Sequence, residues 1–342
     1  MSRSSAWTTL RDRVVRAVRP DRSAELRQGE HVDPAAPGAP APDPTVWDAD
    51  LQAAWHSSEM DDFRSALRRD GRSVRESVVG DLATFYGLSD DEVVRRCIHW
   101  EELSVEEWQA EERKGEDGLL RFYRSTTSWS FDLLWYAYLQ AEGHHRPVSV
   151  AALRWAEART GGRRHLDFGS GIGATGGLFA RRGWESTLAD VSSTLLDFAR
   201  FRLKGLEPSP RFVDLTAEDL PAGAYDVVTA IDALGHVPDI AAAARTLHRA
   251  LAPGGYLLAN IEVRPPSLEN ALHLHVDERR ERYLLLRSGF RQVAMVGDLV
   301  AYQRIDGGGP AELLRRAGLW ARLASPPGRW ARTARRVVRG LR

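Results

Sequence analysis

HLDFGSGIG, at residues 165–173, ends an apolar run with an acid and then places glycines at alternate positions. Gly169, Gly171 and Gly173 let the backbone turn sharply and approach a ligand with no Cβ in the way. The helical run that follows would direct its unpaired N–H groups at that ligand. Asp167, at the end of the apolar run, can bind a hydroxyl or an ammonium group. The stretch therefore predicts a loop that binds a nucleotide-type cofactor.

From residue 163 onward, apolar strand patterns alternate with helical patterns. Strands are expected at residues 165–168, 186–189, 211–213, 226–231 and 255–262. This alternation predicts an α/β fold with a doubly wound, mainly parallel sheet that is covered on both faces. Residues 291–296 and 299–304, joined by Gly297 and Asp298, predict a closing hairpin. The sheet would then have seven strands, with the last one antiparallel.

The chain before this region is predicted to be helical. Helices are expected at residues 61–69, 73–86 and 149–159, with another that begins after Ser89. Ser104, followed three residues later by Glu107, predicts a capping box at a helix start. One long aromatic helix should follow, carrying Phe122, Tyr123, Trp129, Phe131, Leu134, Trp135, Tyr136 and Tyr138. We interpret this region as a cap over the predicted loop.

Composition limits the function classes. The formal net charge is zero, so no overall field attracts nucleic acid. The single cysteine, Cys97, excludes a disulfide framework and a multi-cysteine zinc site, and it fits a reducing compartment. No stretch is long and apolar enough to span a bilayer, and the first residues lack the apolar core of a signal peptide. A cytoplasmic protein is expected.

Four segments are predicted along the chain. Residues 1–44 hold a basic amphipathic helix and a Pro/Ala linker, residues 45–160 the helical cap or substrate region, residues 161–306 the cofactor core, and residues 307–342 an Arg-rich tail. Arginines opposite Trp and Leu at the two ends predict peripheral contact with an anionic membrane or an acidic partner. The alternative is that these helices are solvated or packed on the protein itself.

The glycine loop fits two kinds of cofactor site. Gly171, Gly173 and Gly176 match G-x-G-x-x-G, and Asp190 lies near the spacing of a ribose-binding acid, which is typical of dinucleotide-binding proteins. Asp167, however, precedes the first glycine. There it would repel a pyrophosphate and hold a cationic amino-acid tail, which argues against a dehydrogenase.

DFGSGIG at residues 167–173 resembles the first motif of class I S-adenosylmethionine (SAM)-dependent methyltransferases, D/E-x-G-x-G-x-G. The resemblance continues, in the family's order, through residues 188–200, 217–221, 224–239 and 251–263. It implies a Rossmann-like core and SAM as cofactor. It also implies methyl transfer, by in-line displacement, to an O or N atom of a small molecule or secondary metabolite. The implied cofactor residues are Asp167, Gly169, Gly171, Gly173, Asp190, Val191, Thr216, Ala217 and Asp232.

Within this set, the resemblance gives Asp190 the ribose hydroxyls and Val191 the adenine ring. Two positions depart from the family pattern. Thr216 stands where many relatives carry an Asp that accepts from the adenine amino group, so the Thr216 hydroxyl or the backbone near Ala217 would take that role. Gly235 stands where some relatives carry a metal-binding Glu, which argues against a metal.

Catalytic candidates are His236 after the fourth strand, His273 after the fifth, and Tyr123 in the cap. Other possible bases are His144, His145, His275 and Glu262. His236 can also simply pack locally, and His273 with His275 lacks a third metal ligand nearby. Together with Tyr123, the cap residues Thr126, Thr127 and Trp129 are expected to close over the cofactor.

There are three alternatives to a small-molecule enzyme. One is a SAM-binding partner subunit without catalysis, and another is a methyltransferase that acts on a lipid-like substrate at the membrane surface. A nucleic-acid methyltransferase is disfavoured, because IDAL at residues 231–234 replaces the N/D-P-P-Y/F tetrad and positive charge is confined to the ends.

Overall fold

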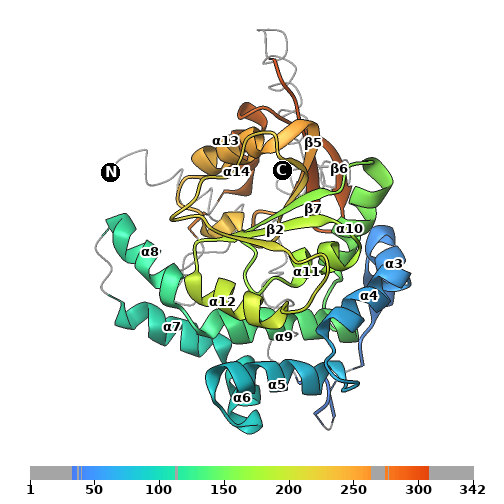
Figure 1. Cartoon of the computed structure of the whole chain (residues 1–342), viewed down its shortest axis with the longest axis vertical. Helices are drawn as coiled ribbons and strands as arrows, with labels where there is room; N and C mark the ends of the chain where they lie inside the picture. Colours follow the sequence, from blue (N-terminus) through green and yellow to red (C-terminus); the bar gives the residue numbers. More distant parts are fainter. Residues whose placement is uncertain are drawn as a thin grey trace, which may run out of the picture.

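A seven-stranded sheet lies at the centre of the protein (Figure 1). The computed structural model describes residues 33–36, 38–39, 41–111, 115–262, 274–275 and 277–307. The strands are β1 (Arg164–Phe168), β2 (Glu185–Asp190), β3 (Arg211–Asp214), β4 (Tyr225–Ala230), β5 (Leu251–Ala259), β6 (Phe290–Val296) and β7 (Leu299–Arg304). They lie in the order β3-β2-β1-β4-β5-β7-β6.

Strands β1 to β5 pair in parallel, and β7 runs antiparallel between β5 and β6. The predicted mainly parallel sheet with an antiparallel last strand is confirmed. Chain order reverses at β1, since β2 lies on one side of it and β4 on the other. In open α/β sheets, ligands bind outside the carboxyl ends of the strands at such a reversal. The predicted loop follows β1 at this place.

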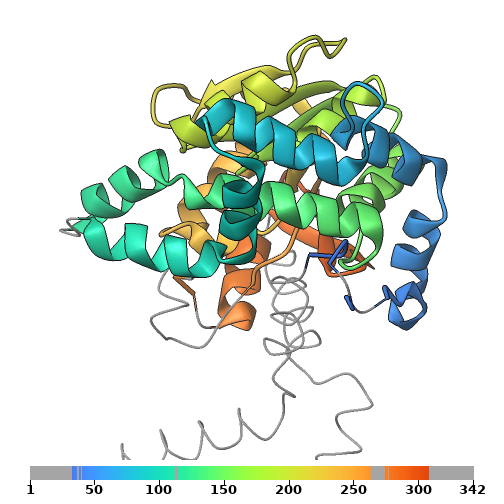
Figure 2. The same cartoon turned by 90° about the horizontal axis from the view of Figure 1, so that it is seen from below.

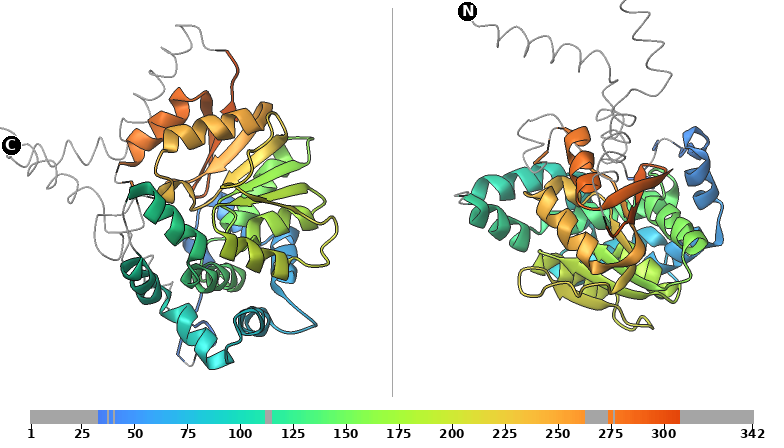
Figure 3. Two further views of the ribbon diagram at one scale, coloured as in Figure 1. Left: turned by 60° about the vertical axis from the view of Figure 1, so that its left-hand side comes forward. Right: turned by 90° about the horizontal axis from the view of Figure 1, so that it is seen from above.

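Both faces of the sheet are covered by helices. Alternate strand residues enter different hydrophobic clusters, as Val227 and Val228 do in β4, because successive side chains of a strand point to opposite faces. Helices α13 (Ile240–Ala250) and α14 (Glu278–Arg287) cover one face. Helices α10 (Val148–Arg159), α11 (Ala174–Arg181) and α12 (Ser193–Arg202) lie on the other. Figure 3 shows the orange α13 and α14 across the sheet from the blue-green helices.

The helices before α10 form the cap (Figure 2). They are η1 (Pro44–Val46), α3 (Ala49–Trp55), α4 (Ser58–Leu67), α5 (Val74–Tyr86), α6 (Asp90–Ile98), α7 (Trp100–Ala110), α8 (Gly115–Ser125) and α9 (Ser128–Glu142). Cap residues share one hydrophobic cluster with α10, α11 and one face of the sheet. The cap is therefore packed on the core, and burial of apolar area holds it there.

Two expectations about the cap are wrong. Ser104 does not begin a helix; it lies inside α7, where its hydroxyl meets the Ser128 hydroxyl at 2.8 Å. Glu107 instead accepts hydrogen bonds from the start of α9, including the Thr127 and Ser128 backbone N–H groups. The aromatic run is two helices, α8 and α9, because the chain leaves helical geometry at Thr126 and Thr127. The side chain that caps the start of α9 comes from another helix, distant in sequence, so residue spacing alone does not reveal it.

Other boundaries differ by a few residues. The Pro253-Gly254-Gly255 turn lies inside β5, where the pairing with β4 shifts register between Tyr225 and Val227. Helices α3 and α14 were not expected. No helix in the described part of the chain has the length and apolarity needed to cross a membrane. The basic helix near the start of the chain and the Arg-rich tail fall outside the described residues, so they stay predictions.

Candidate cofactor site and its cap

The glycine loop connects β1 to α11 and lies between β2 and the cap. All three glycines have a positive φ, 68° at Gly169, 51° at Gly171 and 76° at Gly173, which other residues adopt only with strain. A Cβ on Gly171 would come within 2.6 Å of Leu133 Cδ1, a side chain of α9 in the cap. The loop therefore needs glycine both for its backbone path and for close approach of the cap.

Two buried carboxylates hold this loop from inside. Asp190, at the end of β2, accepts from the Gly171 N–H and from the Ser192 N–H, each at 2.8 Å. Asp167 accepts from the Gly176 N–H at 2.8 Å, in the first turn of α11. The Gly171 N–H is thus bonded to an acid, and the N–H groups of Gly169, Ser170 and Gly173 donate to backbone carbonyls, so a phosphate would find these donors already used. A pyrophosphate would also meet the negative charge of an ionised carboxylate here.

Burial changes the acidity of both groups. Burial raises the pKa of Asp167 to about 7, against hydrogen bonds from Thr229 and Gly176 that favour its anion. Burial also raises the pKa of Asp190, opposed by the N–H donors of Ser192 and Gly171. Each carboxylate oxygen of Asp190 accepts one of these bonds and has a second lone pair left. Asp190 can therefore accept from two further hydroxyls.

A buried series of hydrogen bonds behind Asp167 is not predicted by the sequence. The Thr229 hydroxyl donates to Asp167 Oδ1 at 2.8 Å and lies 2.9 Å from His165 Nε2. The other ring nitrogen, Nδ1, lies 2.9 Å from the Ser186 hydroxyl. Burial lowers the pKa of His165 to about 3, so this ring is neutral. When Asp167 is ionised and accepts from Thr229, the neutral ring donates from Nε2 to Thr229 and accepts at Nδ1 from Ser186.

The residues present fit SAM better than a dinucleotide. The Ser170 hydroxyl in the loop is buried and has no hydrogen-bond partner among the described residues, so it has capacity left for a polar ligand group. Asp190 offers a carboxylate to vicinal hydroxyls, and Val191 beside it offers an apolar surface. The Asp167 carboxylate is 3% exposed and already bonded within the fold. Its predicted contact with a cationic tail stays a prediction.

The carboxyl ends of β4 and β5 are joined by a polar pair. The Asp232 N–H donates to Asn260 Oδ1 at 2.7 Å, and the Asn260 amide donates back to Asp232 Oδ1. Asp232 has a φ of 52°, an unusual value for a residue other than glycine, which the pairing helps to hold. Asn260 was missed in the sequence, since no motif marks it. A Cβ on Gly235 would lie 2.8 Å from the backbone oxygen of Glu262, so the fold leaves no room there for a glutamate.

Several predicted residues come together where the cap meets β4. The His236 ring lies 5.3 Å from the Trp129 ring and 6.4 Å from the Tyr123 ring, measured between centroids. Tyr123 and Phe122 form a small hydrophobic cluster against which Val191 packs. Val191, which is predicted to contact the adenine, thus lies close to Tyr123 of the cap, and Tyr123 lies close to His236. Burial raises the pKa of Tyr123, so its hydroxyl stays protonated at neutral pH.

Other candidate bases lie apart from this group or in supporting roles. His275 donates from Nε2 to the Val237 carbonyl at 2.6 Å, and its Nδ1 lies 3.3 Å from Glu281 Oε1. His145 is buried against Tyr136, and burial lowers its pKa to about 4. His273 falls outside the described residues. Within the described ranges, no three His, Cys, Asp or Glu side chains are grouped to hold a metal.

Thr216 has partners that the sequence did not suggest. Its hydroxyl donates to Asp214 Oδ1 at 2.6 Å and accepts from the guanidinium of Arg124, the residue that follows Tyr123 in α8. Ala217 is exposed beside it, and its N–H donates to the Asp214 carbonyl at 3.0 Å. The segment expected to flank the adenine is therefore contacted by the cap.

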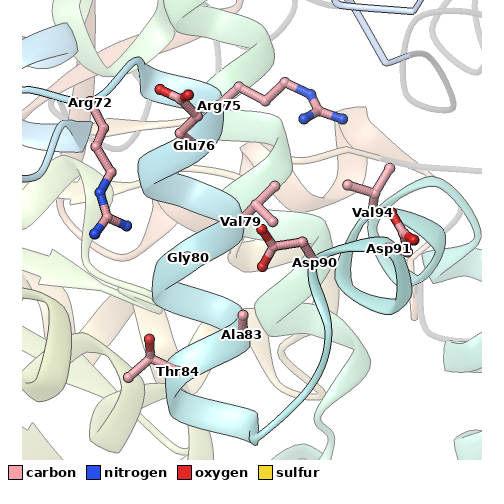
Figure 4. Close-up of a pocket in the computed structure, with 10 residues that line it drawn as sticks. All are labelled: Arg72, Arg75, Glu76, Val79, Gly80, Ala83, Thr84, Asp90, Asp91 and Val94. Carbon is pink, nitrogen blue, oxygen red and sulfur yellow. The ribbon is translucent and has the colours of Figure 1, made fainter.

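A separate pocket lies between α5 and the start of α6 (Figure 4). Its volume is about 470 Å³, and its lining residues are Arg72, Arg75, Glu76, Val79, Gly80, Ala83, Thr84, Asp90, Asp91 and Val94. None of the predicted site residues takes part. Arg75 forms an ion pair with Asp33 at 2.6 Å, so one of the positively charged side chains that line the pocket already has a partner.

Comparison with known proteins agrees with this geometry. Residues 166–257 match the family described as "Methyltransferase domain". A ubiquinone biosynthesis O-methyltransferase of Pseudomonas aeruginosa is 30% identical over 144 residues, which are 40% of this chain and 62% of the relative. The enzyme of the same name from Xanthomonas oryzae pv. oryzae is 37% identical over 138 residues, 37% of this chain and 56% of the relative. The chain thus spans about three fifths of the length of these curated relatives.

Solved structures give a weaker likeness. Phosphoethanolamine N-methyltransferase 2 of Haemonchus contortus, in complex with SAM, matches with a TM-score of 0.44 and 20% identity over 52% of this chain and 45% of that chain. A geranyl diphosphate methyltransferase in complex with GPP and sinefungin matches with a TM-score of 0.42 and 17% identity, over 50% of this chain and 82% of that chain. The assignment rests instead on the sequence match, the strand order and the placement of the motifs. Residues 166–257 match a methyltransferase domain, and the strand order of the sheet and the order of the motifs agree with that match.

Proposed function

We propose that this protein transfers a methyl group from SAM to an oxygen or nitrogen atom of a small molecule. The observation that carries the proposal is the position of Asp190. This residue, 7% exposed, ends β2 beside the glycine loop, inside the matched methyltransferase domain. Relatives named ubiquinone biosynthesis O-methyltransferase support oxygen as the accepting atom.

The residues of the chain divide the work of binding. Asp190 accepts from the ribose hydroxyls, Val191 and the rings beside it contact the adenine, and the Ser170 hydroxyl of the loop faces the amino-acid part. SAM, when bound, supplies a methyl group already activated by the positive sulfur. The protein's main task is then alignment of the acceptor, which is worth about 7–11 kcal/mol in well-oriented reactions.

The cap and the loop after β4 supply the acceptor side. Trp129 and Tyr123 present aromatic surface next to His236, and these side chains exclude water from the region where the methyl group is transferred. His236 is proposed as the base that takes a proton from a hydroxyl acceptor, a role that an acceptor of low pKa would not require. His273 stays a second candidate for this role.

Titration calorimetry tests the cofactor assignment. The wild-type protein should bind SAM and S-adenosylhomocysteine, and Asp190→Ala should weaken the binding by about 1–3 kcal/mol through loss of charge-assisted hydrogen bonds. Binding of a nicotinamide cofactor, with no binding of SAM or S-adenosylhomocysteine, would overturn the proposal.

Turnover is a separate question from binding. Formation of S-adenosylhomocysteine with a cell extract as the acceptor source would separate an enzyme from a SAM-binding subunit without catalysis. Cytoplasmic location, and contact of the Arg-rich ends with a membrane or an acidic partner, are proposals from the sequence alone. Sedimentation with vesicles that contain anionic lipid would test the membrane contact, and a protein left in the supernatant would contradict it.

A further inference from the structure

Arg124 connects the cap to both loops on the expected adenosine side of the site. It lies in the last turn of α8, where helix carbonyls have no partner within the helix. Its own carbonyl accepts from the Ser193 hydroxyl at 3.2 Å and from the Thr194 hydroxyl at 3.1 Å, both in the first turn of α12. These bonds cap the end of α8 with groups from the segment that follows β2.

The side chain of Arg124 reaches the neighbouring segment after β3. Its guanidinium donates to the Thr216 hydroxyl and lies 3.5 Å from Asp214 Oδ2. Asp214 is the partner of Asp190 in the register of β2 and β3, so the two acids stand side by side at the carboxyl edge. Burial acts to raise the pKa of Asp214, but hydrogen bonds from Thr216 and the charge of Arg124 outweigh burial, so this pKa is lowered. Arg124 thus balances a negative charge next to the ribose-binding acid.

Tyr123, the residue before Arg124, lies at the part of the site where the methyl group is proposed to be transferred. Tyr123 packs with Trp129 and lies near His236, while Val191 packs on the same cluster. A movement of α8 at Arg124 would therefore also move the aromatic side chains proposed to exclude water. Arg124 therefore holds the cap in place both at the adenosine side of the site and at the side where the methyl group is proposed to be transferred.

We infer that Arg124 is a positioning residue that fastens the cap to the segments after β2 and β3, and that it thereby retains the cofactor. This inference rests on the proposed function and deepens it. It explains why Thr216 stands where relatives carry an acid: a hydroxyl there both accepts from Arg124 and donates to Asp214, whereas a second carboxylate would not donate.

The test uses the full-length protein with S-adenosylhomocysteine as the probe, and stopped-flow tryptophan fluorescence to follow its release. Arg124→Gln should raise the dissociation rate about fivefold, because an exposed ion pair and one charge-assisted hydrogen bond are lost. Arg121→Gln is the matched control. That arginine lies one turn earlier in α8 and pairs with Glu111 of the cap, at 3.3 Å.

Two further measurements separate fastening from loss of stability. Thr216→Val removes the acceptor on the core side, and combined with Arg124→Gln it should add little to the dissociation rate, since both changes break the same contact. Hydrogen exchange of the α8 amides, without any ligand, should be faster in Arg124→Gln than in Arg121→Gln. Added salt should raise the wild-type dissociation rate more than that of Arg124→Gln, because salt screens the pair with Asp214.

Equal dissociation rates and equal α8 exchange for the Arg124 and Arg121 variants, with tight wild-type binding, would overturn the role of Arg124 and leave the proposed function standing. A wild-type protein that binds neither S-adenosylhomocysteine nor SAM would overturn the proposed function itself.

Discussion

Asp167 should make the stability of the protein fall as pH rises toward neutrality. Its pKa is about 7 in the folded protein against 3.8 for an unperturbed Asp. The folded state therefore holds a proton that the unfolded chain has released, and stability is lost between these two pKa values as pH rises. From pH 5 to pH 8 the loss attributable to this one group is about 2.5 kcal/mol by linkage.

Asp167→Asn isolates this effect. The variant cannot titrate at this position, so its stability should lack the Asp167 contribution to pH dependence, although a mismatched hydrogen bond to Gly176 gives it a constant deficit of about 1 kcal/mol. His165 acts in the opposite direction, since its lowered pKa costs stability only below about pH 6.5. That contribution is common to both proteins and cancels in the difference.

The assay is urea unfolding at half-unit steps from pH 5 to pH 8, with wild type and variant side by side. The unfolding free energy of the wild type minus that of Asp167→Asn should decrease by about 2.5 kcal/mol from pH 5 to pH 8. Parallel curves would refute the reasoning, because they would mean that Asp167 ionises alike in the folded and unfolded chains.

Two more changes test the packing between loop and cap. Gly171→Ala should cost about 2–3 kcal/mol of unfolding free energy, because its φ is positive and the new Cβ meets Leu133; adding Leu133→Ala should remove the clash but keep the backbone strain. Urea unfolding of both variants checks this, and an unchanged midpoint for Gly171→Ala would contradict it. Glu107→Gln should lower the unfolding free energy by about 2 kcal/mol, since its carboxylate accepts from N–H and O–H groups at the start of α9. Thermal melts measure this effect, and the control substitution Glu106→Gln, at an exposed neighbour, should melt like the wild type.

The sheet was readable from the sequence because its signals are local. Strand residues alternate or run apolar, helices fill the intervals, and Gly297 with Asp298 sets the hairpin turn. The cofactor loop was readable for the same reason, since its acid and glycines are adjacent in the chain. The break between α8 and α9 was not, because aromatic residues fit the inside of a helix as well as its ends.

The partners of the site residues came only from the tertiary structure. Asn260 meets Asp232 across two strands, and Glu107 reaches the start of α9 from another helix. Arg124 meets Thr216 across 92 positions of the chain. Nothing in the spacing of such residues marks them, since long-range pairing depends on how elements pack.

The sequence by itself determined the kind of fold and the cofactor loop of residues 167–173, because backbone conformation there depends on glycine and on neighbours within a few residues. Only the tertiary structure decided how the two acids are used. The sequence predicts both Asp167 and Asp190 as ligand-binding carboxylates, but it does not reveal that Asp190 accepts from the Gly171 N–H and Asp167 from the Gly176 N–H. A carboxylate's partners depend on which N–H groups the folded chain brings within 3 Å, and packing of β1, β2 and the cap sets that distance.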